Sequence, residues 1–122
     1  MPDFDWREYL VFADHAMTNM QHYPVSHEAM ARIAISRAYY AAHNRARDWY
    51  SRNHGISVSH SRLINHLLSL PTRNLQKIGN DLDNLRNQRN RADYDGRAPG
   101  LQESAPQILQ AAERVLRATT TS

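Results

Sequence analysis

The feature that most constrains this fold is a long stretch, residues 26–52, that is rich in alanine and contains neither glycine nor proline. Glycine and proline are the residues that weaken or break the interior of a helix. Ser26 is a typical N-cap, and Glu28 lies in the first turn, where a negative charge is favourable. The Asn-His-Gly sequence at 53–55 is a helix stop. We therefore expect one long helix, the longest element of the chain.

Two neighbouring faces of this expected helix differ in chemistry. The side predicted to be buried carries apolar residues at helical spacing, namely Ile35, Tyr39, Ala42, Ala46 and Trp49. The face beside it is polar and aromatic, namely Ser36, Tyr40, His43, Arg47 and Tyr50. Because alanines allow a second helix to approach closely, we expect the first side to face the core.

The rest of the chain is also expected to be helical. Apolar residues recur at helical spacing in further segments: 5–20, 59–70, 72–94, and a last one from Gln102 or Pro106 to Ala118. No segment shows the alternation typical of a strand. The sequence thus predicts an all-α fold, an up-and-down bundle of about five helices. At 122 residues the chain is expected to form one domain, 1–122, with its core over 5–118.

Composition excludes several classes of site. The absence of cysteine rules out disulfides, a thiolate nucleophile and cysteine-ligated zinc, and it fits a reducing compartment. The histidines show no pairing typical of metal ligands, so neither a metal site nor a cofactor is expected. No apolar run is long enough to span a bilayer, and the N-terminus lacks a signal-peptide core. We therefore expect a cytoplasmic protein without a membrane partner.

The charge balance permits a nucleic-acid partner. The formal net charge is +3, and Lys77 is the only lysine among 15 basic residues. Arginine is the better bidentate binder of phosphate, although an arginine-biased genome explains the ratio equally well. The segments 26–54 and 72–97 carry a net positive charge, whereas 1–25 is acidic. The basic segments coincide with the second and fourth expected helices.

The segment 85–95, LRNQRNRADYD, concentrates hydrogen-bonding groups at the end of the fourth expected helix. Residues three, four and seven apart share a helix face. Two adjacent stripes result: Arg86, Arg89 or Asn90, and Asp93 in one, and Asn87, Asn90, Arg91 and Tyr94 in the other. The apolar stripe of this helix reaches Arg89 after Leu85. A charge in the core register needs a partner, and Asp93 is the nearest candidate.

Three segments together resemble the HEPN superfamily of small helical domains: SRAYYAA at 36–42, His60 at the start of the next helix, and 85–94. The resemblance covers about residues 5–118. It implies a helical bundle that dimerises through its long helices. It also implies metal-independent ribonuclease activity of the kind found in RNA-targeting toxins, phage-defence systems and CRISPR effectors. Other members of the superfamily are inactive dimerisation or RNA-binding modules.

The chain departs from the pattern of the active branch of this superfamily. That branch is marked by an arginine, usually followed by a polar residue, and by a histidine a few positions later. Arg86 and Asn87 match, but Arg91, Ala92 and Asp93 occupy the histidine places. Tyr94 matches the aromatic residue that often follows.

Cleaving RNA without metal requires a base, an acid and a cation near the phosphate. Arg86 can stabilise the phosphate, but arginine does not release its proton. Asp93, near three cations, is a weak base. We therefore predict that His43 replaces the missing histidine, because it shares a helix face with other polar residues and histidine titrates near neutral pH. The predicted catalytic set is Arg86, Asn87, Asp93 and His43.

RNA is expected to bind the surrounding basic and aromatic residues, namely Arg89, Asn90, Arg91, Tyr94, Arg37, Tyr40 and Arg47. Simpler interpretations remain open. Arg89 and Asp93 can form a structural ion pair, Arg86 and Asn87 can belong to a solvated face, and His43 can be an interface histidine.

Three functions follow from the sequence. The favoured one is a homodimeric ribonuclease of a toxin-antitoxin or phage-defence system. The second is a catalytically inactive module that binds RNA or a nucleotide. The third is a dimerisation or antitoxin-like adaptor that works with a protein encoded nearby.

Overall fold

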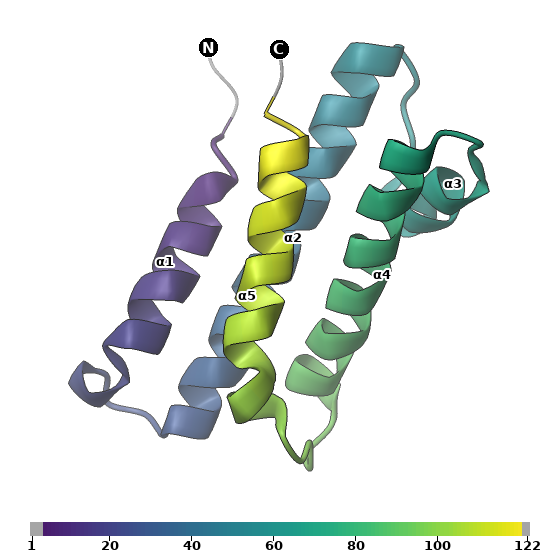
Figure 1. The fold of residues 1–122 in the computed structure, drawn as a ribbon. Helices are drawn as coiled ribbons and strands as arrows, with labels where there is room; N and C mark the ends of the chain where they lie inside the picture. Colours follow the sequence, from purple (N-terminus) through teal and green to yellow (C-terminus); the bar gives the residue numbers. More distant parts are fainter. Residues whose placement is uncertain (1–3, 121–122) are drawn as a thin grey trace.

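The bundle is built from five α-helices within residues 4–120, which are the residues that the computed structural model describes. The elements run in the order α1 (Arg7–Thr18), η1 (Met20–His22), α2 (His27–His54), η2 (His60–Arg62), α3 (Leu63–Ser69), α4 (Arg73–Tyr94) and α5 (Leu101–Ala118), where η marks a 3-10 turn. The longer helices α1, α2, α4 and α5 run alternately down and up (Figure 1). No strand occurs in residues 4–120, and the predicted all-α bundle is confirmed. The predicted domain, 1–122, extends past the described residues at both ends.

Helix α2 begins and ends where its sequence indicates. The hydroxyl of Ser26 accepts a hydrogen bond from the backbone N–H of Ala29 at 3.1 Å, as expected for an N-cap. At the other end Gly55 has a φ of +66°, and its N–H donates to the carbonyl of Ser51 at 2.9 Å. Glycine adopts this left-handed conformation without steric cost. The predicted cap and stop are both present.

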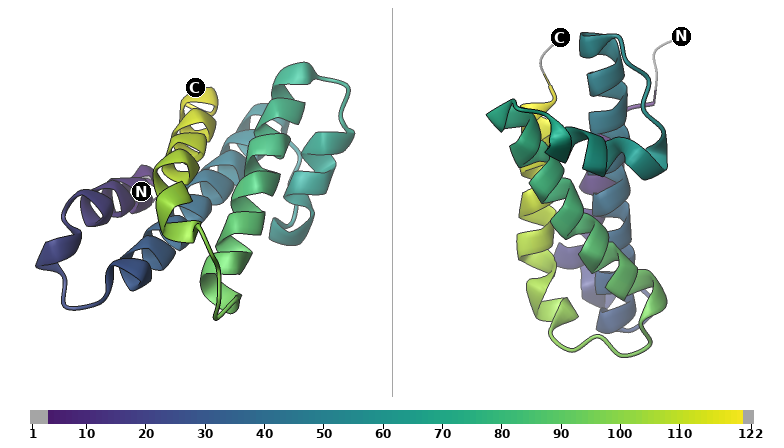
Figure 2. Two further views of the ribbon diagram at one scale, coloured as in Figure 1. Left: turned by 60° about the horizontal axis from the view of Figure 1, so that its bottom comes forward. Right: turned by 90° about the vertical axis from the view of Figure 1, so that its right-hand side faces the viewer.

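Helix α2 packs against α1, α4 and α5 and forms the centre of the bundle (Figure 2). Ala34 and Ala38 have no exposed surface, so the neighbouring helices approach closely. The predicted buried side is confirmed except at Trp49, which is only half-buried. His43 and Tyr50, expected on the polar face, are buried as well. The reason is that other elements cover α2 on more sides than a single apolar stripe indicates.

Two segments depart from the predicted boundaries. The expected helix 59–70 is divided into η2 and α3, and the side chain of Ser59 caps neither. The last helix begins at Leu101, directly after Gly100 with its φ of +77°. Pro106 therefore lies inside α5 and removes one backbone hydrogen bond. Burial of the apolar face of α5 outweighs this local penalty, since most helical stability in proteins comes from packing.

An ion pair ties α1 to α5. Two nitrogens of the Arg7 guanidinium donate to the two carboxylate oxygens of Glu113, each at 2.9 Å. These hydrogen bonds lower the pKa of Glu113 from its ordinary value of 4.5. Favouring the charged form of a carboxylate in the folded state makes stability depend on pH.

We expect this ion pair to stabilise the fold only above acidic pH. Because the pKa of Glu113 is lower in the folded chain than in the unfolded one, its contribution is complete above the ordinary pKa of 4.5 and is lost as the pH falls through the folded value. Replacing Glu113 by glutamine should cost at most about 1 kcal/mol at about pH 7, because the pair is partly exposed. The cost should shrink at about pH 3. Urea unfolding of both proteins at the two pH values measures it, and an equal cost at both would contradict the prediction.

Candidate functional site

Arg32 of α2 holds the C-terminal end of α4 in place. Its Nη1 donates to the carbonyl oxygens of Ala92 and Asp95, at 2.9 and 2.7 Å. The last carbonyls of a helix have no partner inside the helix, and a cation beside them is also favoured by the helix dipole. Glu28 accepts a hydrogen bond from Nε of the same arginine at 3.1 Å. The polar end of α4 is thereby fixed on α2.

Arg89 is the central cation of this region. Its guanidinium carbon lies 4.8 Å from the ring centroid of Tyr39, 5.6 Å from that of Tyr40 and 5.9 Å from that of Tyr94. Only 13% of the Arg89 side chain is exposed. Aromatic rings at these distances attract a cation. The three tyrosines therefore form a frame around a partly desolvated positive charge.

Arg89 has hydrogen-bond donors that are not fully paired. Its Nη1 lies 3.9 Å from Oδ2 of Asp93, which confirms the ion pair expected between them but makes it a long one. Ser36 donates to the same carboxylate oxygen at 3.3 Å. The buried Nε of Arg89 finds no hydrogen-bond partner among the described residues. An unpaired buried donor is costly. Because Nε itself is buried, a ligand can reach only the part of the Arg89 side chain that is exposed.

Arg86 is engaged within its own helix. Its Nη2 lies 2.6 Å from Oδ1 of Asp83, one turn earlier in α4, and a third of its side chain is exposed. Asn87 and Asn90 are exposed. Arg91 donates to the backbone carbonyl of Pro99 at 2.7 Å and so supports the connection to α5. Among the predicted arginines of α4, Arg89 is therefore the one whose Nε is buried and has no hydrogen-bond partner in the described residues.

His43 is buried beneath His60 and does not face solvent. Its ring is fully buried, and Nε2 donates to the backbone carbonyl of His60 at 3.1 Å. Burial, followed by the charge of a protonated His60, lowers the pKa of His43 to about 3, so the ring is neutral at physiological pH. A fully buried imidazole does not contact a substrate. The catalytic role expected for His43 does not fit this position.

His60 is the accessible histidine here; the sequence placed it at the start of the next helix but did not predict that it lies beside His43. Its ring centroid lies 3.9 Å from that of His43, and its ring stacks toward Tyr40 at 6.4 Å. The residue is exposed, and no hydrogen bond within residues 4–120 holds its ring nitrogens. Partial burial and the positive charges of Arg47 and Arg89 lower its pKa.

The length of the connection after α2 explains why His60 meets His43. A helix rises about 1.5 Å per residue, so His43 lies about 17 Å below His54. The extended segment from Gly55 to His60 covers about the same distance at roughly 3.3 Å per residue. The chain therefore runs back beside α2 before α3 begins, as the right-hand view of Figure 2 shows. The length of the connection, compared with the rise of the helix, is thus the sequence signal that places His60 beside His43.

We call this group of residues the Arg89 cluster, which consists of Ser36, Tyr39, Tyr40, His60, Arg89, Asp93 and Tyr94. It joins α2, η2 and α4 at one surface. Burial raises the pKa of Tyr39, against the opposing influence of Arg89, so this tyrosine remains neutral. The cluster thus offers a cation, neutral aromatic rings, a neutral imidazole and a carboxylate.

Two other predicted RNA-binding arginines lie differently. The guanidinium of Arg37 packs over the ring of Tyr9 at 5.2 Å and so faces α1. Arg47 pairs with Asp48 at 3.2 Å but still influences His60 electrostatically. The structure therefore brings Arg47 toward the Arg89 cluster and leaves Arg37 on the other side of α2.

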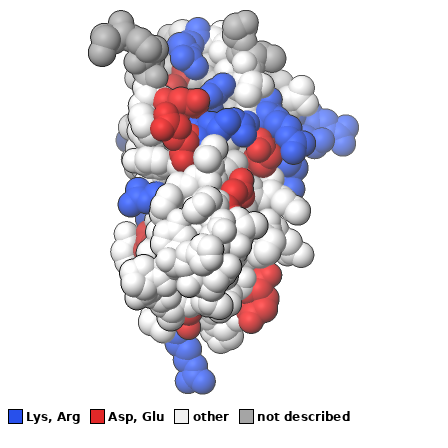
Figure 3. All heavy atoms as spheres, turned by 90° about the vertical axis from the view of Figure 1, so that its left-hand side faces the viewer, with Lys and Arg blue, Asp and Glu red and all other residues white. Residues whose placement is uncertain are grey.

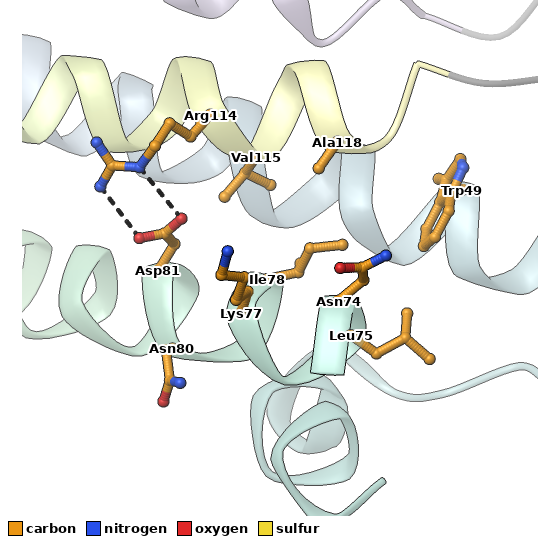
Figure 4. A pocket seen from close by; sticks show the side chains of 10 residues that line it. All are labelled: Trp49, Asn74, Leu75, Lys77, Ile78, Asn80, Asp81, Arg114, Val115 and Ala118. Atoms are coloured by element: carbon orange, nitrogen blue, oxygen red, sulfur yellow. Dashed lines mark hydrogen bonds and ion pairs between the residues drawn. The ribbon is translucent and has the colours of Figure 1, made fainter. Parts of the chain in front are cut away.

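A groove of about 850 Å³ between α4, α5 and Trp49 offers little chemistry. Three charged side chains line it, and two of them, Asp81 and Arg114, are paired across it at 3.1 Å, while the third is Lys77 (Figure 4). Much of the remaining lining is apolar or amide in character, including Leu75 and Val115. Because Asp81 and Arg114 satisfy each other and Lys77 is the one further charged group in the lining, the groove is not the candidate site.

The α1 side of the molecule shows no continuous basic surface (Figure 3). Acidic and basic side chains are interspersed toward one end, and much of the rest is uncharged. Val11 and Phe12 of α1 are exposed, at 59% and 43%. This side therefore lacks the electrostatic character that attracts a polyanion.

Two kinds of site are not found in the described part of the chain. No group of histidine, aspartate or glutamate side chains within residues 4–120 is arranged to hold a metal ion. None of the helices there is long and apolar enough to cross a membrane.

The family model described as HEPN domain matches residues 19–121, which include every residue of the Arg89 cluster. No match is found among curated proteins, and none among solved structures. The resemblance seen in the sequence is thereby confirmed. Since the match spans most of the chain, this protein belongs to the HEPN domain family.

Proposed function

We propose that this protein is a metal-independent endoribonuclease of a toxin-antitoxin or phage-defence system, active in the cytoplasm as a homodimer. Membership in the HEPN family indicates an RNA-related or nuclease-like function, and HEPN domains often dimerise. The choice of RNA cleavage depends on the chemistry of the Arg89 cluster.

The single observation that carries the proposal is the state of Arg89. Its guanidinium is framed by Tyr39, Tyr40 and Tyr94, and its Nε has no hydrogen-bond partner among the described residues. A phosphodiester is an anion whose oxygens accept hydrogen bonds from guanidinium groups. Tyr94, 73% exposed, offers a ring on which a base can stack. The cluster therefore suits a nucleotide unit better than an isolated anion.

Exposed apolar surface near this cluster supports placing the proposed dimer interface there. Ile33 of α2, one turn before Ser36 of the cluster, is a large apolar side chain that remains 42% exposed. An exposed apolar side chain next to a polar site is typical of an interface. Dimerisation here would bring the two copies of the Arg89 cluster toward each other.

The second candidate function is an inactive RNA-binding module. It is favoured by the motif itself, where Arg91, Ala92 and Asp93 occupy the histidine places, and by the engagement of Arg86 with Asp83. Such a module would use the same Arg89 cluster to bind RNA without cutting it.

Incubating the purified protein with labelled tRNA and mRNA in EDTA tests the proposal. We expect cleavage that persists in the chelator. RNA that shifts in a native gel in a salt-dependent manner but stays intact would support the inactive module instead. If RNA is neither bound nor cut, the cluster is structural, and both functions are wrong. Sedimentation at micromolar concentration tests the dimer.

A further inference from the structure

We propose that His60 is the general base of this site, the residue that accepts the proton of the attacking 2′-hydroxyl of RNA. The inference rests on the proposed ribonuclease function and gives it the histidine that the segment 85–95 lacks. It assigns the role to a residue on η2, outside α4, the helix that carries Arg86, Asn87 and the empty histidine places.

His60 and Arg89 flank the same two aromatic rings. The ring centroid of Tyr39 is 6.5 Å from that of His60 and 4.8 Å from the guanidinium carbon of Arg89. For Tyr40 the corresponding distances are 6.4 and 5.6 Å. Both groups therefore border the same aromatic surface, over which a nucleotide whose phosphate is bound by Arg89 can extend toward the imidazole. A base must be within hydrogen-bond reach of the proton it takes, and this arrangement allows it.

A hydrogen bond from His43 holds the backbone of His60 in place. His43 donates its Nε2–H to the carbonyl of His60, and the two rings are in contact at 3.9 Å between centroids. Because His43 is buried and neutral, it contributes this hydrogen bond without placing a second charge beside His60. We assign His43 as the positioning residue for His60.

The surroundings keep His60 in the form that a base requires. The groups that face it are His43, Tyr39, Tyr40 and Arg47 of α2 and Arg89 of α4. Both arginines are positive, and together with partial burial they lower the pKa of His60 below its ordinary value of 6.5. The imidazole is therefore mostly unprotonated near neutral pH, with a lone pair available.

The proposed step is a transesterification. A ring nitrogen of His60 takes the proton of the 2′-hydroxyl while that oxygen forms a bond to phosphorus. The bond from phosphorus to the 5′-oxygen breaks, and the leaving oxygen takes a proton from water. The imidazolium then returns its proton to the solvent. The products are a 2′,3′-cyclic phosphate and a 5′-hydroxyl, and no oxidant or metal takes part.

Single-turnover cleavage by His60→Gln tests the inference. We expect the rate to fall by about 10²–10⁴-fold, the usual contribution of a general base. The affinity for an RNA whose reactive 2′-hydroxyl is replaced by hydrogen should stay unchanged, because Arg89 still binds the phosphate. His22→Gln, which removes an exposed histidine from η1, is the matched control and should cleave like wild type.

Two further readouts separate catalysis from folding. The pH profile of the wild-type rate should rise to a plateau with an inflection below 6.5, and this inflection should vanish in the variant. Added imidazole should restore cleavage to His60→Ala, and the melting temperatures of both variants should match wild type. If His60→Gln cleaves RNA at the wild-type rate and with the same pH profile, His60 is not the general base. The proposed ribonuclease function would still stand. An inactive wild-type protein overturns both.

Discussion

Replacing Arg89 by alanine is expected to reduce RNA cleavage by about 10²–10³-fold, as is typical when a donor that stabilises developing negative charge is removed. Arg89 is the arginine in α4 that combines a nearly buried side chain with an unpaired Nε among the described residues. Its charge is also held in the frame of three tyrosines, where low exposure strengthens its attraction for an anion.

Two control variants give this prediction its specificity. Arg89→Lys keeps the positive charge but lacks the planar fork, so it should recover only a small part of the activity. Arg114→Ala removes the same charge from a mostly exposed side chain that pairs with Asp81 across the groove between α4 and α5. It should leave cleavage unchanged. Equal losses in the Arg89 and Arg114 variants would show that only net charge matters and would contradict the assignment.

The second large effect concerns stability. Arg32→Ala should lower the free energy of unfolding by about 1.5–3 kcal/mol, the range for losing a hydrogen bond to a charged group. The variant leaves the carbonyls of Ala92 and Asp95 without the cation that now caps the end of α4. Urea unfolding measures the loss. Arg52→Ala is the control, because Arg52 is an exposed arginine near the end of the same helix.

Arg32→Ala should also loosen the site itself. Amide hydrogen exchange is expected to accelerate over residues 91–96, where the cap is lost, more than over the first turns of α4. Cleavage should fall as well, since Asp93 and Tyr94 lie in this last turn. Unchanged exchange at 91–96 would mean that packing alone holds the helix end.

Local signals were sufficient for most of the fold. The N-cap at Ser26, the stop at Gly55 and the helical spacing of apolar residues each depend on a few neighbouring residues, and each appears in the structure. The Arg89–Asp93 ion pair is likewise set within one turn of one helix. Such features are predictable because their geometry does not depend on distant parts of the chain.

The candidate site was less predictable, since it depends on contacts between separate elements. Helical spacing placed His43 on a polar face, but η2 returns beside α2 and covers it. The same return makes His60 the accessible histidine. Helical periodicity alone also gave no reason to separate Arg37, which faces Tyr9 of α1, from the arginines near the cluster. The burial of His43 and the exposure of His60 both follow from the path of the segment between α2 and α3. Helical periodicity does not predict that path.

The central claim is that RNA binds through its phosphodiester at the Arg89 cluster, and binding of an RNA that cannot be cleaved tests it most directly. The RNA carries hydrogen in place of its 2′-hydroxyls, and its affinity for wild type, Arg89→Ala and Arg114→Ala is measured over a range of salt concentrations. The account predicts that Arg89→Ala binds this RNA more weakly than the other two proteins. Its salt dependence should also be shallower, by the slope that corresponds to about one phosphate contact. Equal affinity and equal salt dependence for all three would contradict it.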